Sequence, residues 1–156
     1  MINNEYIGKN SLENIKYLSI EKNYKKILIF AGKNSFSISG AKSQLKTILS
    51  KFKYEVFYKT KQLPDIEDLK NFITKINNFR PDLIVAIGGG AVLDLAKVSN
   101  SLHNCENLEE SIKNSSNELN NFCELIAVPT TAGSGAETTS SAVMYVNKIK
   151  YSVEGK

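Results

Sequence analysis

The chain has 156 residues, of which 42% are hydrophobic, 9% aromatic and 23% charged. This length suits one domain, and the apolar content is enough for a buried core, which excludes a disordered chain, a collagen-like repeat and a fibrous coiled coil. The net charge of +4 comes almost entirely from lysines spread along the chain, with Arg80 the only arginine. Because nucleic-acid sites favour clustered, arginine-bearing patches, we expect no nucleic-acid partner.

The two cysteines, Cys105 and Cys123, are too few for a disulfide scaffold, and neither belongs to a C-x-x-C pair. A reducing compartment is therefore expected. The first ten residues lack an apolar signal core, and no stretch reaches the roughly 20 apolar residues that cross a bilayer. These observations predict a cytoplasmic protein with no membrane partner.

Four short apolar segments, each ended by Gly, Pro or polar residues, are typical of strands buried on both faces. They are residues 27–30, 54–58, 83–87 and 125–128. Helical spacing of apolar residues predicts helices over 39–52 and 65–79, a third that begins at Gly90, and a short one over 108–113 within a polar connection. The second helix has a start signal, since Pro64 and Asp65 are followed by Asp68.

Strands that alternate with helices require right-handed crossovers and a parallel sheet. The sequence therefore predicts an α/β fold, a doubly wound parallel sheet. After Pro129 the pattern changes, because residues 141–146 and 149–153 are β-rich and are separated by Asn147-Lys148. This spacing predicts a C-terminal β-hairpin.

A run of three glycines, Gly88-Gly89-Gly90, stands between the third apolar segment and the helix that follows it. Glycine lets the backbone approach a diphosphate closely, and the free N–H groups of a helix start favour an anion. The run matches neither G-x-G-x-x-G nor the P-loop, since no G-K-[ST] follows. The spacing favours phosphate binding over the alternative, a tight turn that needs glycine only for packing.

Asp94 and Lys97 lie three residues apart on that helix. We interpret Lys97 as one partner of an ion pair within the helix. Asp94 lies one turn from the glycines among apolar neighbours, so its carboxylate either joins the pair or points into the cleft, toward a ligand or the neighbouring loop. The sequence leaves both arrangements open.

A hydroxyl- and glycine-rich loop, residues 128–141, leaves the carboxyl end of the fourth predicted strand. Ligands bind at that edge of open α/β sheets, where hydroxyl groups can donate to phosphate or ribose oxygens. A flexible connector rich in Ser and Thr would have the same composition. The loop alone does not decide between the two.

Together the two motifs resemble the paired signature of the iron-containing, or group III, alcohol dehydrogenases. The motifs are Gly88-Gly89-Gly90-Ala91-x-x-Asp94-x-x-Lys97 and Pro129-Thr130-Thr131-Ala132-Gly133-Ser134-Gly135-Ala136-Glu137. The resemblance extends from Gly8 to Tyr151. It implies a Rossmann-like domain of the dehydroquinate synthase-like N-terminal type, which spans residues 1–156 and binds NAD or NADP.

The resemblance also implies which residues contact the cofactor. The glycine run with Ala91 would hold the diphosphate, the hydroxyl loop would line the adenosine and nicotinamide sides, and the hairpin would close over it. The expected cofactor residues are Gly32, Lys33, Ser35, Gly88, Gly89, Gly90, Ala91, Asp94, Thr130, Thr131, Ser134, Val143 and Lys150.

Many NAD-using relatives carry an aspartate just after the first strand, where it binds the ribose 2′-hydroxyl and repels a 2′-phosphate. Here the segment reads Ala31-Gly32-Lys33-Asn34-Ser35 and contains no acid. A lysine and a serine would tolerate or attract a 2′-phosphate. We therefore expect NADP rather than NAD.

Relatives of this family hold a divalent metal between an aspartate and three histidines in a following helical domain. This chain has one histidine, His103, which we interpret as a surface residue near a helix end. We expect residues 1–156 to be the N-terminal, truncated part of an NAD(P)-dependent alcohol dehydrogenase or aldehyde reductase that is inactive alone. Fe²⁺ or another divalent metal would bind only in the full-length protein, and no catalytic residue or metal ligand is assigned here.

The implied substrates are small alcohols and aldehydes, with phosphonoacetaldehyde among the candidates. A homodimer is expected, because loss of the helical domain would expose the apolar wall of the cleft. Two other functions stay open. One is a non-catalytic nucleotide-binding module, complete as it stands, and the other is a fragment of a dehydroquinate synthase-like lyase, whose loop should not read Thr-Thr-Ala-Gly-Ser-Gly.

Overall fold

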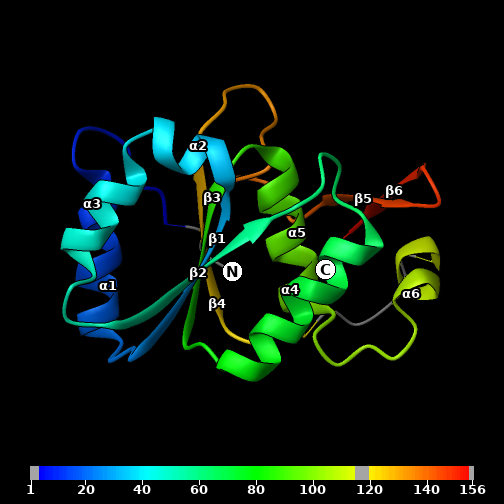
Figure 1. Ribbon diagram of the computed structural model, residues 1–156, viewed down its shortest axis with the longest axis horizontal. Helices are drawn as coiled ribbons and strands as arrows, with labels where there is room; N and C mark the ends of the chain where they lie inside the picture. The colour runs from blue at the N-terminus through cyan, green and yellow to red at the C-terminus, as the bar shows by residue number, and fades with distance from the viewer. Residues whose placement is uncertain (1–3, 115–119, 155–156) are drawn as a thin grey trace.

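Four parallel strands form the central sheet, in the spatial order β2-β1-β3-β4 (Figure 1). They are β1 (Lys26–Gly32), β2 (Lys53–Lys59), β3 (Leu83–Gly88) and β4 (Glu124–Pro129). Each contains one of the four segments predicted from apolar runs, so the parallel α/β fold is confirmed. The computed structural model describes residues 4–114 and 120–154.

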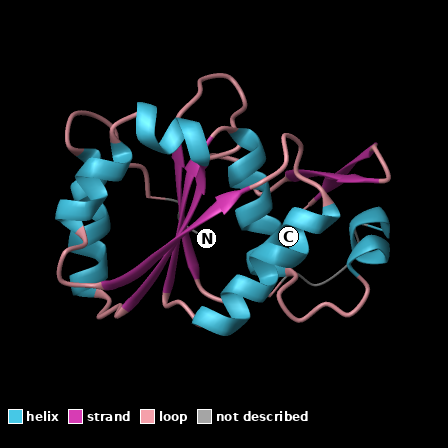
Figure 2. Cartoon of the chain, viewed as in Figure 1, coloured by secondary structure: helices cyan, strands magenta, loops and turns pink. Residues whose placement is uncertain are grey.

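Helices cover both faces of the sheet (Figure 2). One face is covered by α1 (Asn14–Glu21), α2 (Lys33–Ile38) and α3 (Ala41–Ile48), and the other by α4 (Ile66–Phe79) and α5 (Gly90–Ser101). The 3₁₀ helix η1 (Ser11–Glu13) precedes α1, and α6 (Leu108–Asn114) lies in the connection to β4. In the described part of the chain, no helix has the length and apolar character needed to span a membrane.

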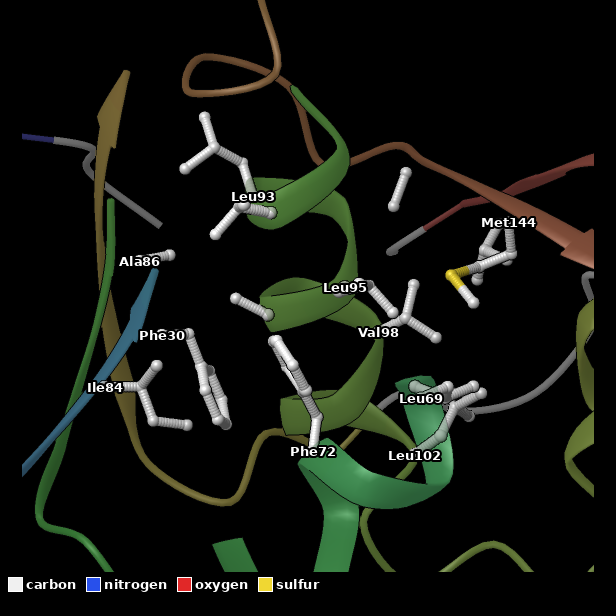
Figure 3. Packing of buried hydrophobic residues seen from close by; sticks show 14 of the residues in the cluster. Phe30, Leu69, Phe72, Ile84, Ala86, Leu93, Leu95, Val98, Leu102 and Met144 are labelled. Atoms are coloured by element: carbon white, nitrogen blue, oxygen red, sulfur yellow. The ribbon is translucent and has the colours of Figure 1, made fainter. Parts of the chain in front are cut away.

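Alternate residues of β1 enter two separate hydrophobic cores, as the two-residue repeat of a strand requires. Leu28 and Phe30 join the core beneath α4 and α5, while Ile29 joins the core beneath α1–α3. Phe30 stacks on Phe72 of α4 with ring centroids 4.1 Å apart (Figure 3). The continuous apolar character of the strands therefore reflects burial on both faces.

The predicted hairpin forms from β5 (Ala142–Val146) and β6 (Ile149–Val153), and it packs on the side of α5 away from the sheet (Figures 1 and 3). Leu93 faces the sheet, whereas Met144 of the hairpin lies on the other side of the helix. Because α5 is covered on both sides, it is apolar around most of its circumference. Asn147 and Lys148 form the turn with φ of 51° and 67°, as a type I′ turn requires.

One helical prediction needs correction, and two helices were not predicted. The predicted helix over 39–52 is α3 alone, and it begins at Ala41 because Gly40, with φ of 76°, separates it from α2. Neither α2 nor α1 was predicted. In α1 only Ile15 and Ser19 are buried, while the apolar Ile20 is 60% exposed, so its sequence lacks a clear apolar face.

The other helix boundaries are confirmed. Asp65 is the N-cap of α4 and accepts a hydrogen bond at 2.9 Å from the N–H of Asp68. Helix α5 begins at Gly90, and α6 includes the predicted residues 108–113.

Candidate functional site

The chain connections diverge at the carboxyl ends of β1 and β3. After β1 the chain enters α2 on one face of the sheet, and after β3 it enters α5 on the other. A crevice forms where neighbouring connections leave on opposite faces, and ligands of open α/β sheets bind there. Gly32 ends β1 and Gly88 ends β3, so both predicted glycines lie at this point.

Both strand ends require glycine for space. A Cβ atom on Gly88 would lie 2.7 Å from Cγ2 of Val92, in the first turn of α5. A Cβ atom on Gly32 would lie 2.6 Å from Oγ of Ser35 and 3.6 Å from the same Val92 methyl group. Val92 therefore lies between the two strand ends, and glycine brings α5 close to the sheet.

The amino end of α5 faces the crevice without a side-chain cap. Gly89 is the N-cap residue, and its carbonyl accepts from the N–H groups of Val92 and Leu93 at 2.9 and 3.3 Å. The N–H groups of Gly90 and Ala91, at the start of the helix, have no partner within the helix. Such groups, aligned with the helix dipole, favour an anion.

The hydroxyl loop after β4 lies directly against the glycine run. The N–H of Thr130 donates to the carbonyl of Gly88 at 2.9 Å, which continues the pairing of β3 with β4. A Cβ atom on Gly89 would lie 3.1 Å from Oγ1 of Thr131, and one on Gly90 would lie 3.1 Å from Cβ of Ser134. The structure thus brings together the two motifs that the sequence singled out.

One hydroxyl group of this loop is left without a partner. The Oγ1 atom of Thr130 is buried and makes no hydrogen bond with the described residues. An unpaired buried hydroxyl costs about 1–3 kcal/mol. The donors that face the crevice are the free N–H groups at the start of α5 and the hydroxyl groups of Thr131 and Ser134 beside the glycine run, and this set fits a dinucleotide diphosphate.

Asp94 points toward the hairpin. Its side chain is buried and lies near the backbone N–H of Val143 in β5. Burial raises the pKa of Asp94, and the Val143 N–H and the charges of Lys97 and Lys150 oppose this rise. With Ser134 and Val143, Asp94 lines a pocket of about 270 Å³ between α5, the hydroxyl loop and the hairpin.

Lys97 anchors the end of the hydroxyl loop. Its ammonium donates to the carbonyls of Thr139 and Ser141 at 2.9 and 2.8 Å. This differs from the ion pair with Asp94 that we expected from their spacing, because the two side chains turn to different parts of the loop and the hairpin. Burial lowers the pKa of Lys97, and the nearby Asp94 and Glu137 carboxylates oppose this effect.

The raised pKa of Asp94 predicts a pH-dependent effect of Asp94→Asn. Because the folded-state pKa lies above the unfolded one, the stability that Asp94 contributes is present at low pH and is lost as pH rises through the folded-state pKa. Asparagine does not titrate and keeps a carbonyl oxygen near the Val143 N–H. We therefore expect the melting temperature of the variant, relative to the unsubstituted chain, to be higher at pH 7 than at pH 3. Thermal melts at both values test this, and an unchanged or reversed difference would contradict it.

The residues after β1 form a second cavity. Lys33 and Ser35 lie on α2 rather than in a loop, and Oγ of Ser35 donates to the carbonyl of Gly32 at 3.3 Å. Lys33 and Lys42 line a pocket of about 430 Å³ together with Tyr58 of β2. Lys42 and Tyr58 carry no motif, and only the meeting of α2, α3 and β2 places them beside Lys33.

The remaining predicted residues are on the hairpin. Val143 lies in β5, and Lys150 lies in β6 opposite Tyr145.

His103 lies just after α5, with its Nδ1 atom 3.1 Å from the carbonyl of Asn100. Within residues 4–114 and 120–154, no group of three or more His, Cys, Asp or Glu side chains could hold a metal ion. The described residues therefore do not fit a metal centre, and we assign no step through one to this chain.

The fold is an α/β domain in which the glycine run and the hydroxyl loop meet at the carboxyl edge of the sheet. Residues 3–156 match the family described as iron-containing alcohol dehydrogenase. The chain belongs to the iron-containing alcohol dehydrogenase family.

Individual relatives agree with this assignment. The chain is 32% identical to an alcohol dehydrogenase of Thermococcus barophilus, over 94% of this chain and 40% of the relative. It is 30% identical to the NADPH-dependent butanol dehydrogenase of Clostridium saccharobutylicum, over 94% of this chain and 38% of the relative. The solved iron-containing alcohol dehydrogenase of Thermococcus thioreducens matches with a TM-score of 0.81 and 25% identity, over 94% of this chain and 40% of that one. The chain thus spans about 40% of the length of these relatives.

Proposed function

We propose that residues 1–156 are the N-terminal dinucleotide-binding part of a metal-dependent NAD(P)H alcohol dehydrogenase or aldehyde reductase. The observation that carries this proposal is the uncapped amino end of α5, with the side chains of Thr131 and Ser134 against its glycine run. Both features supply donors to one anionic ligand. Family membership supports a nicotinamide dinucleotide as that ligand.

Each motif has a separate task in this proposal. The N–H groups of Gly90 and Ala91 bind the diphosphate, which the missing Cβ atoms of the glycines allow to come close. Thr130, Thr131 and Ser134 contribute hydroxyl donors from the opposite wall. The bound nicotinamide supplies hydride transfer, and the chain's own contribution is to bind and orient it.

We propose the alcohol or aldehyde substrate for the whole protein, not for these 156 residues alone. The relatives that share this segment include an alcohol dehydrogenase and a butanol dehydrogenase, which supports an alcohol or aldehyde here. Because the chain spans about 40% of those relatives, we propose that the remaining part supplies the metal ligands and most of the substrate contacts. The 156 residues alone are then expected to bind nucleotide without turnover.

We further propose a preference for NADPH over NADH. No carboxylate lies between Gly32 and Ser35 to repel a 2′-phosphate, and Lys33 and Lys42 line the neighbouring pocket. We expect isothermal titration to give a lower Kd for NADPH than for NADH. The Lys33→Gln variant should weaken NADPH binding about threefold to tenfold and leave NADH binding unchanged.

Lys46→Gln, on the exposed side of α3, serves as the control and should change neither affinity. A tenfold preference for NADH, about 1.4 kcal/mol, would overturn the NADPH assignment. An equal effect of both lysine variants would show that only general charge matters.

A further inference from the structure

The loop between β2 and α4, residues 60–65, leaves the sheet beside the proposed cofactor site. Lys59, the last residue of β2, is the register partner of Gly32 at the end of β1. The ammonium of Lys59 turns back onto this loop and donates to the carbonyls of Lys61 and Gln62, the latter at 2.8 Å. The loop therefore starts at the β1 side of the crevice.

A buried carboxylate organises the start of the loop. Asp68, in the first turn of α4, is only 1% exposed. It accepts from the N–H groups of Thr60 and Lys61 at 3.2 and 2.9 Å, and from the hydroxyl of Thr60 at 2.5 Å. A carboxylate taken out of water requires such donors, and these bonds are stronger than neutral ones.

The other end of the loop is joined to the hairpin. The carbonyl of the buried Pro64 accepts from the N–H of Tyr145 at 2.8 Å, and Asp65 forms a parallel bridge with the same residue. Tyr145 pairs with Lys150 across the hairpin and is two residues from Val143. The loop thus runs from the end of β2 to the part of the hairpin that carries both proposed cofactor residues.

We propose that Asp68 is a positioning residue for cofactor binding. Its carboxylate fixes Thr60 and Lys61, which holds the loop in the shape that places Pro64 against Tyr145. This contact sets the position of β5 and β6 over the crevice. Asp68 itself touches no cofactor, and the inference rests on the proposed nucleotide-binding function.

The chain offers a matched control at the opposite end of the sheet. Asp82 precedes β3, and its Oδ2 atom accepts from the consecutive N–H groups of Lys25 and Lys26 at 2.7 and 2.9 Å. Asp68 and Asp82 therefore make the same kind of contact with two backbone N–H groups. Of these two contacts, only the one made by Asp68 lies at the carboxyl edge of the sheet, beside the proposed cofactor site.

The test compares Asp68→Asn with Asp82→Asn, since asparagine keeps the size of the side chain but replaces one acceptor oxygen with an NH₂ group. Isothermal titration of each chain with NADPH, below both melting temperatures, gives the Kd, and hydrogen exchange gives the protection of the Tyr145 amide. We expect Asp68→Asn to weaken NADPH binding at least tenfold and to speed exchange at Tyr145. Asp82→Asn should bind as the unsubstituted chain does and leave Tyr145 protected.

Several outcomes would overturn the inference. NADPH binding by Asp68→Asn within twofold of the unsubstituted chain, unchanged protection of Tyr145, or equal weakening by both variants would each do so. If Asp68→Asn does not fold, Thr60→Val removes only the hydroxyl donor, and it should still speed exchange at Tyr145. If the unsubstituted chain itself binds no NADPH, the proposed function fails and the inference fails with it, a result distinct from the variant-specific ones.

Discussion

Replacing Gly89 with valine is expected to weaken NADPH binding at least 100-fold, about 2.8 kcal/mol, while the chain stays folded. Gly89 has φ of −76° and ψ of 176°, which valine adopts without strain. Its Cβ atom would lie 3.1 Å from Oγ1 of Thr131, an exposed side chain that can move aside. The added methyl groups would then fill the space through which a diphosphate reaches the start of α5. Isothermal titration measures the loss.

Gly88→Ala is the matched comparison, because the neighbouring glycine faces the core. Its new Cβ atom would lie 2.7 and 2.8 Å from two atoms of Val92, so α5 would have to move from the sheet. The Gly88 variant should therefore lower the melting temperature, whereas the Gly89 variant should lower the affinity. An affinity of Gly89→Val within threefold of the unsubstituted chain would contradict the placement of the diphosphate.

The Phe72→Ala substitution is expected to reduce the free energy of unfolding by about 3–5 kcal/mol. Phe72 is fully buried, stacks on Phe30, and meets the edge of Phe57 with ring centroids 5.5 Å apart. Alanine would leave a cavity at the centre of the core between the sheet and α4 (Figure 3). Since the total free energy of unfolding of a domain is only about 5–15 kcal/mol, this loss is a large share of the stability. Urea denaturation measures it.

Asn71→Ala provides the control on the same helix. Asn71 is exposed, so its substitution should change the free energy of unfolding by less than about 0.5 kcal/mol. A loss below about 1 kcal/mol for Phe72→Ala would show that the aromatic cluster does not carry the stability assigned to it.

Local sequence patterns were sufficient to predict those elements whose structure depends on residues close together in the chain. The apolar runs predicted all four strands of the sheet, because each strand is covered on both faces or lies beside one that is. Asn147-Lys148 predicted the hairpin turn, since both residues adopt the positive φ that a type I′ turn needs. The glycine run predicted the strand-to-helix junction at Gly90. The pattern failed for α1, whose apolar residues do not gather on one face.

By itself, therefore, the sequence determined the α/β class, the hairpin and the two motifs of the candidate site. Only the tertiary structure decided that Lys97 binds Ser141, 44 residues away, rather than Asp94. It alone placed Asp94 beside Val143 and Asp68 beside the loop after β2. A carboxylate or an ammonium can pair with many groups along a chain, and which one it meets depends on how helices and strands pack. Spacing along the sequence does not contain that information.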